Sequence, residues 1–524
     1  MTIHCEVLTG VDGARIGIAT LDAPKALNAL TLPMIEVLGE QLHAWARDPG
    51  IVCVLLRGNG AKAFCAGGDV RALVQACRDH PGSVPPLAAS FFAAEYRLDF
   101  ALHTYPKPLL CWGHGHVLGG GMGLLQGANV RIVTPSSRLA MPEISIGLYP
   151  DVGASWFLAR LPGKLGLFFG LTGAPINARD ALDLGLADRF LGEHQQEALV
   201  EELLQLNWQE QTAVQLNSLL KAEQHRACAE LPDAQWLPRR HVIDQLLDVA
   251  DAASAWRALE RLKQHDDPLL ADAGQRLHEG CPLTAHLVWE QIRRARYLSL
   301  AQVFQMEYSM SLNCCRHPEF SEGVRARLLD KDNQPRWHWP DVAQVPAAVV
   351  EAHFAKRGRD ATHWRMWVSF VNLGLLFSPA STHLALPVSS LPLPAPTLPA
   401  PAVITLPIGV PVAMPVTLAV IAIVMAIPVL PVVLSLAIAI VIARVAMPLV
   451  HPWLRIWPVI GRRGRPMVVT GGRLIVIARG WRHIVPVIAV IPRRHIAVGG
   501  VVVRTVIAPA LVVRGAGRSH QPAG

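Results

Sequence analysis

The stretch that decides how this chain is interpreted is Ala140–Gly153, which reads AMPEISIGLYPDVG. It holds two acidic residues, Glu143 and Asp151, and a proline stands directly before each of them. Proline restricts the local backbone, so these prolines can fix where the two carboxylates point. Without the glycine turns described next, two surface acids in loops would be the better interpretation of this stretch.

Two glycine-rich turns lie upstream of this stretch. The first, Cys65-Ala66-Gly67-Gly68-Asp69, precedes a predicted helix over Val70–Cys77, and the second is Gly119-Gly120-Gly121. Glycine lets the backbone bend and leaves its N–H groups unshielded. A helix N-terminus also favours a developing negative charge. For the first turn, an ordinary tight turn after a strand is the alternative.

Other kinds of glycine-rich loop fit the second turn less well. No Gly-Lys-Ser/Thr follows it, which argues against a nucleotide phosphate loop, and the spacing and acidic residue of a dinucleotide fingerprint are missing. His114 and His116 have no third ligand nearby, so we interpret them as structural and predict no metal site. Paired carboxylates beside bare backbone N–H groups are what acyl-thioester chemistry needs. The oxyanion needs fixed donors, and the carbonyl carbon needs an attacking oxygen or a base.

Hydrophobic periodicity predicts an α/β core. Strands are expected over residues 3–8 and 15–21, followed by a helix over Thr31–Arg47 that Thr31 caps. The continuous apolar run at 51–56 suits a buried strand. Strand, strand and helix recur loosely as ββα-like units. Further strands are predicted at 109–112 and 130–133, and further helices at 120–126, 164–171, 178–184, 197–206 and 299–312.

The net charge of +8 is the sum of two unlike segments. All 40 Asp and Glu residues and every Lys lie at or before Asp360, whereas residues 361–524 carry 14 Arg and no acid. The first 360 residues are therefore slightly acidic. The basic total is no argument for nucleic-acid binding, and we predict no nucleic-acid partner.

The tail at 361–524 departs abruptly in composition. Leu391–Pro401 is rich in proline, and Leu418–Ala443 is apolar and long enough to span a bilayer, although Pro428 and Pro431 interrupt it. One interpretation is a membrane anchor. The other is a frameshift or run-on product, since a segment of Val, Ala, Pro, Arg, Leu and Gly is typical of a misread GC-rich frame. The composition favours the second, which predicts an apolar and Arg-rich tail with no packed core.

The cysteines predict a reducing compartment. All nine lie before residue 360, their number is odd, and no C-x-x-C occurs. Met1 leads almost directly into a predicted strand, without a secretory signal or an Arg-rich transit peptide. We therefore expect a cytoplasmic location.

The motifs together resemble the crotonase, or enoyl-CoA hydratase/isomerase, superfamily, and most closely its branch of 3-hydroxyisobutyryl-CoA hydrolases. The resemblance covers roughly residues 3 to 357. It rests on 62–71 with the first glycine turn, Glu95-Tyr96, Lys107-Pro108, Leu118–Gly123, Ala140–Gly153, 161–166, 171–173, 306–308, 322–326 and 330–332.

The resemblance implies a spiral of ββα units with a helical C-terminal region, assembled as a homo-oligomer. We accordingly divide the chain into a catalytic core at 1–190, a helical region at 191–360 that completes the fold, and the tail. The resemblance also implies roles. The N–H groups of Gly68 and Gly120 would form the oxyanion hole, and Glu143 and Asp151 would be the catalytic pair. Glu95, Ala63, Ala66 and Gly67 would contact an acyl-CoA substrate.

One departure separates the functions within the superfamily. Hydratases resembling this chain carry a catalytic glutamate just after the triple-glycine turn, and this chain has Gly123 there. Thioester hydrolysis, which releases CoA from 3-hydroxyisobutyryl-CoA in valine breakdown, therefore fits better than hydration. It needs no cofactor, because CoA is part of the substrate. The alternatives are an enoyl-CoA hydratase or isomerase, and a noncatalytic acyl-CoA-binding protein tethered to a membrane by the tail.

Overall fold

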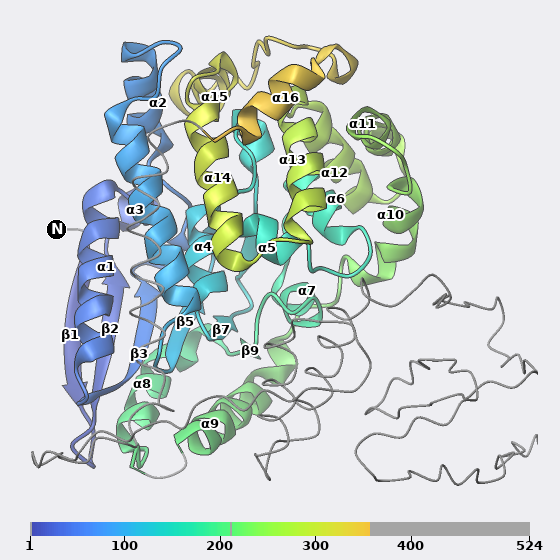
Figure 1. Cartoon of the computed structure of the whole chain (residues 1–524). Coiled ribbons are helices and arrows are strands. Elements are labelled where there is room, and N and C mark those ends of the chain that lie inside the picture. The colour runs from blue at the N-terminus through green and yellow to red at the C-terminus, as the bar shows by residue number, and fades with distance from the viewer. Residues whose placement is uncertain (1–2, 210–211, 357–524) are drawn as a thin grey trace, which may run out of the picture. The chain divides into compact units, whose positions relative to one another are not determined.

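Two parallel arrays of strands organise the first half of the chain. The computed structural model describes residues 3–209 and 212–356 (Figure 1). The expectations for the tail at 361–524 lie outside the described residues. Among the helices that are described, none combines the length and the continuous apolar character needed to cross a bilayer.

The larger array is a six-stranded sheet with the order β1-β2-β3-β5-β7-β9. Its first two strands form an antiparallel hairpin, and every later pairing is parallel. The buried run of β3 matches the continuous apolar segment of the sequence, as a strand covered on both faces requires. The strands are β1 (Ile3–Thr9), β2 (Arg15–Leu21), β3 (Ile51–Gly58), β5 (Leu109–Gly113), β7 (Val130–Val133) and β9 (Arg189–Phe190).

The smaller array is a three-stranded parallel sheet with the order β4-β6-β8. Each of its strands, β4 (Ala63–Cys65), β6 (His116–Leu118) and β8 (Arg138–Ala140), is three residues long. The pairs β3–β4, β5–β6 and β7–β8 each send their first strand to the large sheet and their second to the small one. This alternation gives the repeated units of the predicted crotonase-like spiral.

Helices follow these strand pairs and cover the sheets. In α1 (Leu32–Arg47), Thr31 accepts a hydrogen bond from the Met34 N–H, and an apolar stripe that includes Leu38 and Trp45 is buried. Asp69 caps the next helix in the same way. The helices that complete this half are α2 (Val70–Asp79), α3 (Pro86–His103), α4 (Gly120–Gly127), α5 (Ala154–Leu158), α6 (Leu165–Thr172) and α7 (Ala178–Asp183).

The two faces of the large sheet belong to different apolar clusters. Alternate residues of β3 point to opposite faces, so Val54 and Leu56 join the main core while Cys53 and Leu55 join a second cluster. The second cluster is closed by α8 (Gln196–Gln205) and α9 (Thr212–Ala227), drawn below the sheet in Figure 1.

The remaining described chain is helical, as the sequence predicted. Its helices pack against α3, α5 and α6 and supply the side of the molecule away from α8 and α9 (Figure 1). They are α10 (Arg240–Leu246), α11 (Ala252–Glu260), α12 (Pro268–His278), α13 (Pro282–Ala295), α14 (Leu300–Cys314), α15 (Pro318–Val324) and α16 (Ala347–Phe354), with a π-helical turn at Arg325–Leu329.

The predicted α/β class and the crotonase-like spiral are confirmed. The expected strands at 15–21 and 130–133 have the observed bounds, and the predicted helices lie within two residues of the observed ones at each end. The small sheet was not predicted. The division of the core at residue 190 stays a prediction.

Candidate active site

Three loops leave the carboxyl ends of the small sheet. Because β4, β6 and β8 run parallel and adjacent, the segments that follow them emerge at one edge. Gly67 and Gly68 follow β4, Gly119 and Gly120 follow β6, and Glu143 follows β8. The fold therefore brings the two glycine turns and the proline-flanked acid of the sequence together.

The two glycine turns lie in direct backbone contact. A Cβ atom built on Gly120 would lie 3.5 Å from the Gly68 nitrogen, and one on Gly67 would lie 3.8 Å from the Gly120 nitrogen. A side chain at Gly121 would come within 2.2 Å of the Cys65 carbonyl oxygen. Gly67 and Gly119 also have φ values of +106° and +49°, which favour glycine. These glycines are required because the two backbones must approach closely.

The N–H groups of Gly68 and Gly120 are available at this junction. Gly120 is the first residue of α4, and the first N–H groups of a helix have no partner within it. Within the described chain, neither N–H donates to a backbone carbonyl in a turn or loop. Two neighbouring backbone donors without a backbone acceptor can bind an oxyanion.

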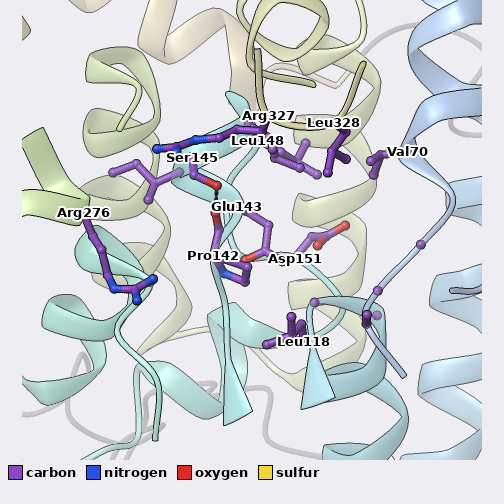
Figure 2. A pocket seen from close by; sticks show the side chains of 18 of the residues that line it. Val70, Leu118, Pro142, Glu143, Ser145, Leu148, Asp151, Arg276, Arg327 and Leu328 are labelled. Carbon is purple, nitrogen blue, oxygen red and sulfur yellow. Dashed lines mark hydrogen bonds between the residues drawn. The ribbon is translucent and has the colours of Figure 1, made fainter. Parts of the chain in front are cut away.

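A cavity of about 570 Å³ opens over these turns. This volume falls within the usual range for small-molecule sites. Figure 2 shows Glu143 and Asp151 at its centre, with Leu118 on one side and Arg327 and Leu328 on the other. Of the predicted site residues, the cavity lining includes Ala66, Gly67, Gly68, Glu95, Gly120, Glu143 and Asp151.

Ala63 lies apart from the cavity lining. It is buried in β4, and its carbonyl accepts a hydrogen bond from the Asn28 side-chain amide at 2.9 Å. Its expected contact with the CoA adenine stays a prediction.

Glu143 begins the 3₁₀ turn Glu143–Ile146 directly after Pro142. Its side chain is buried, and its Oε2 atom has no hydrogen-bond partner among the described residues. Its Oε1 atom would lie 2.8 Å from a Cβ built on Gly119, so the carboxyl sits beside the second glycine turn. Burial raises its pKa well above the usual range, and the charge of Asp151 raises it further.

Glu95 reaches the glycine turns from α3. Its Oε1 atom would lie 2.7 Å from a Cβ built on Gly120 and 3.7 Å from one built on Gly68. Burial raises the pKa of Glu95 well above the usual range, with further contributions from Asp151 and Glu143. In its protonated form Glu95 can donate a hydrogen bond as well as accept one.

Asp151 faces the same cavity from the end of the Ala140–Gly153 stretch. Burial raises its pKa to about 6, and a hydrogen bond from the Tyr96 hydroxyl to its Oδ2 atom, 2.6 Å long, opposes that shift. The next loop is fixed by Glu307 of α14, which accepts hydrogen bonds from the N–H groups of Gly153 and Ser155. Three carboxyls with raised pKa values therefore share one cavity, a pattern typical of sites that move protons.

A side chain at position 123 would meet close neighbours in this packing. A Cβ built on Gly123 would lie 2.7 Å from the Val152 Cβ and 2.9 Å from the Asp99 Oδ1. The space beside α4 is thus already occupied by buried groups. The sequence of α4 contains no carboxylate, and the side chains packed beside Gly123 leave little room for one at that position.

The histidines near the second turn have ordinary surroundings. The Nε2 atom of His114 lies 2.7 Å from the Gly60 carbonyl oxygen, and His116 is exposed in β6. Within residues 3–209 and 212–356, no group of three or more His, Cys, Asp or Glu side chains is placed to hold a metal ion.

Sequence reasoning missed the residues behind the cavity. Tyr96, Ser311 and Glu307 contact Asp151 or its loop from α3 and α14. Tyr96 had a signal, because it directly follows Glu95 in a segment that carries the family resemblance. No sequence pattern pointed to Ser311, since it lies 215 residues from Tyr96 in the chain.

Comparisons with known proteins identify related sequences. The family described as Enoyl-CoA hydratase/isomerase matches residues 16–354. The chain is 38% identical over 363 residues to the mitochondrial 3-hydroxyisobutyryl-CoA hydrolase of Danio rerio, covering 67% of this chain and 92% of that protein.

Two solved structures have a similar fold. A carnitinyl-CoA dehydratase from Mycobacterium thermoresistibile has 33% identity and a TM-score of 0.60, covering 68% of this chain and 97% of its own. An enoyl-CoA hydratase from Rhodobacter sphaeroides 2.4.1 has 30% identity and a TM-score of 0.58, covering 68% and 98%.

Proposed function

The chain belongs to the enoyl-CoA hydratase/isomerase family, and on that premise we propose that it hydrolyses 3-hydroxyisobutyryl-CoA to 3-hydroxyisobutyrate and CoA. The observation that carries the proposal is the similarity to a hydrolase of that name over 92% of that protein's length. The cavity adds support, because buried carboxyls and the two glycine turns line it together.

The N–H groups of Gly68 and Gly120 would bind the thioester oxygen in this proposal. Negative charge develops on that oxygen when the carbonyl carbon is attacked, and fixed donors stabilise it. Removing one such donor typically lowers the rate by about 10²–10³. The pantetheine arm would pass Ala66 and Gly67, which line the cavity beside the first turn.

Glu143 would supply the attacking oxygen or the base. In one route its carboxylate attacks the carbonyl carbon, the C–S bond breaks to release CoA thiolate, and water then hydrolyses the mixed anhydride. In the other route Glu143 removes a proton from water, which attacks directly. A pKa raised by burial makes Glu143 a stronger base near neutral pH.

Asp151 and Glu95, which also line the cavity, would assist. Asp151, whose pKa is about 6, would position the substrate hydroxyl or water and give a proton to the departing sulfur. Glu95 lies close to both glycine turns and would contact the acyl group. No metal or redox cofactor enters this scheme.

The second candidate function is enoyl-CoA hydration, favoured by the names of the two similar structures. The packing at Gly123 argues against it, since the site lacks a carboxylate from α4. The two functions are separated by assaying thiol release from 3-hydroxyisobutyryl-CoA beside hydration of crotonyl-CoA. We expect thiol release to be faster by at least about 10². Faster hydration would reject the hydrolase.

The route of attack is tested separately. A single turnover in water enriched in oxygen-18 labels Glu143 only if its carboxylate attacked the carbonyl. Label found in the product alone means that water attacked the acyl carbon, either of the thioester or of the mixed anhydride. Trapping the anhydride with hydroxylamine then distinguishes these two routes.

The remaining expectations stay predictions. The relative from Danio rerio is named mitochondrial, so its name does not support the expected cytoplasmic location of this chain. The homo-oligomeric assembly and any role of the tail at a membrane likewise await a test.

A further inference from the structure

A chain of buried hydroxyl groups leads away from Asp151 into the core. The Tyr96 hydroxyl lies 2.6 Å from the Asp151 Oδ2 and 2.6 Å from the Ser311 Oγ. The Ser311 Oγ lies 2.8 Å from the Tyr149 hydroxyl, which donates to the Glu307 carbonyl oxygen at 2.5 Å. Tyr96, Tyr149 and Ser311 have no exposed surface. Four short O···O contacts therefore join a cavity carboxyl to a backbone carbonyl.

The protons available to this chain do not match its contacts when Asp151 is ionised. Each hydroxyl of Tyr96, Ser311 and Tyr149 carries one proton, and a carbonyl oxygen carries none. Three protons can make only three of the four hydrogen bonds. The fourth contact then brings two oxygen lone pairs together in a buried site, which is unfavourable.

A proton on Asp151 completes the chain. The carboxyl then donates to Tyr96, Tyr96 to Ser311, Ser311 to Tyr149, and Tyr149 to the Glu307 carbonyl. All four contacts become hydrogen bonds pointing the same way. The chain thus has two arrangements, and the protonation of Asp151 selects between them.

We infer that Ser311, acting through Tyr96, is a positioning residue that sets the protonation state of Asp151. The inference rests on the proposed function only for its role in the reaction. When Asp151 loses its proton, the Tyr96 hydroxyl turns to donate to the carboxylate. One of the contacts beyond Tyr96 then has no proton and is no longer a hydrogen bond. Ser311 therefore favours the protonated acid, although it does not touch the cavity.

The chain also restricts where the proton can go. It ends on a backbone carbonyl, which cannot take up a proton, so the chain offers no exit to solvent. A proton held by Asp151 returns to the cavity. In thioester hydrolysis the departing sulfur must gain a proton, and Asp151 is placed to store it.

Other groups facing Asp151 act in the same direction on its titration. Their negative forms oppose ionisation of Asp151, and burial does so too. These groups are Glu95 and Asp99 on α3, Glu143 and Tyr149 shortly before Asp151 in the chain, and Glu307, Cys314 and Cys315 on or next to α14. Tyr96 acts in the opposite direction, because its hydrogen bond to the carboxylate favours ionisation. Of these groups only Tyr149 contacts Ser311, so Ser311→Ala leaves the carboxyls and thiols around Asp151 in place.

The test is a double-mutant cycle on the full-length protein. In Ser311→Ala, Tyr96 has no serine hydroxyl to bond with. It therefore donates to the ionised carboxylate without the loss of another hydrogen bond, and ionisation of Asp151 becomes more favourable. The alkaline limb of the kcat/KM profile for thiol release, which reports loss of the Asp151 proton, should move down by about half to one pH unit. In a Tyr96→Phe background, Ser311→Ala should leave the limb where it is, because the connection to Asp151 is already cut.

Ser309→Ala is the matched control. Ser309 is also buried on α14, and its hydroxyl donates to the Gln305 carbonyl at 3.1 Å, away from the chain. It should not move the limb. An upward shift or no shift in Ser311→Ala, or an equal shift in both backgrounds, overturns the inference. If Tyr96→Phe fails to fold, the direction of the Ser311→Ala shift against Ser309→Ala still decides.

A second readout separates this inference from the proposed function. The carbonyl stretch of protonated Asp151 can be titrated by infrared spectroscopy, with Asp151→Asn identifying the band. A wild-type protein without thiol release would reject the hydrolase, yet the same downward shift in Ser311→Ala would still support the chain. If thiol release is observed but the titration of the Asp151 band is unshifted in Ser311→Ala, the role of the hydroxyl chain is rejected while the hydrolase stands.

Discussion

The two sheets of this protein divide stability and chemistry between them. The large sheet has strands of up to eight residues, and their apolar side chains are part of both the main core and the second cluster. The small sheet has strands of three residues, yet Gly68, Gly120 and Glu143 all follow its carboxyl ends. The difference teaches that a short parallel array can act as a frame for loops while a neighbouring sheet contributes strands to both apolar clusters.

The largest effect on activity is expected at Glu143, which follows the small sheet. Glu143→Gln removes the proposed nucleophile or base at the small sheet while keeping its shape. We expect kcat for thiol release to fall by about 10³ or more, in the upper part of the range for such groups. The temperature of thermal unfolding should hardly change. Turnover within tenfold of the wild type would remove Glu143 from the mechanism.

The reverse effect is expected at Leu55 in the large sheet. Leu55→Ala deletes a fully buried side chain from the cluster closed by α8 and α9, away from the cavity. The free energy of unfolding in urea should fall by about 3 kcal/mol, with kcat per folded molecule unchanged. Val7→Ala, at an exposed position of β1, is the control and should change stability by less than about 0.5 kcal/mol. A tenfold loss of kcat in Leu55→Ala would break the division between the sheets.

Two glycines provide a third contrast. In Gly120→Ala the new methyl group would lie 2.7 Å from the Glu95 Oε1, so the carboxyl and the turn must shift. We expect kcat to fall by about 10², the effect of a misplaced oxyanion donor. In Gly39→Ala, within α1, the methyl group meets nothing within 4 Å. That variant should gain about 0.5–1 kcal/mol of stability with full activity. Equal activities of the two variants would contradict the assignment of the turn.

The smallest expected effect concerns Asp99, behind α4. Both of its carboxyl oxygens are buried without a hydrogen-bond partner among the described residues, and burial raises its pKa well above the usual range. A raised pKa stabilises the fold at low pH, and this contribution is lost as the pH rises through the folded-state value. Asp99→Asn should therefore flatten the decline of unfolding free energy between pH 5 and 8. The gain at pH 8 should be about 1 kcal/mol.

Asp188→Asn is the control of opposite sign. Arg131 pairs with Asp188 at 2.8 Å and holds the pKa of this carboxyl below its usual value despite burial. Its contribution is present above the unfolded-state pKa and is lost as the pH falls. Asp188→Asn should thus lose stability at neutral pH, where Asp99→Asn gains it. A loss of stability at pH 8 in both variants would contradict the assignment for Asp99.

The sequence was sufficient for five of the six strands of the large sheet and insufficient for β9 and for the small sheet. The apolar run of β3 and the capped stripe of α1 carry local patterns that a window of residues reveals. Three-residue strands are too short to show a period, and the pairing of Ala63 with His116 joins segments 53 positions apart in the chain.

The candidate site divides in a similar way. Glu143, Asp151 and the glycine turns were found because resemblance to a family points to them, and the fold places them around one cavity. The contact of Tyr96 with Ser311 depends on how α14 packs against α3, which no local pattern encodes. Tyr96 and Ser311, which affect the protonation of Asp151 from the side away from the cavity, were therefore not predicted.

The most direct test of the account is a crystal structure of Glu143→Gln with 3-hydroxyisobutyryl-CoA bound. The account predicts the thioester oxygen at about 2.7–3.1 Å from the nitrogens of both Gly68 and Gly120, with position 143 and Asp151 facing the carbonyl carbon. A thioester oxygen that contacts neither nitrogen, or a carbonyl carbon lying away from both side chains, would contradict it.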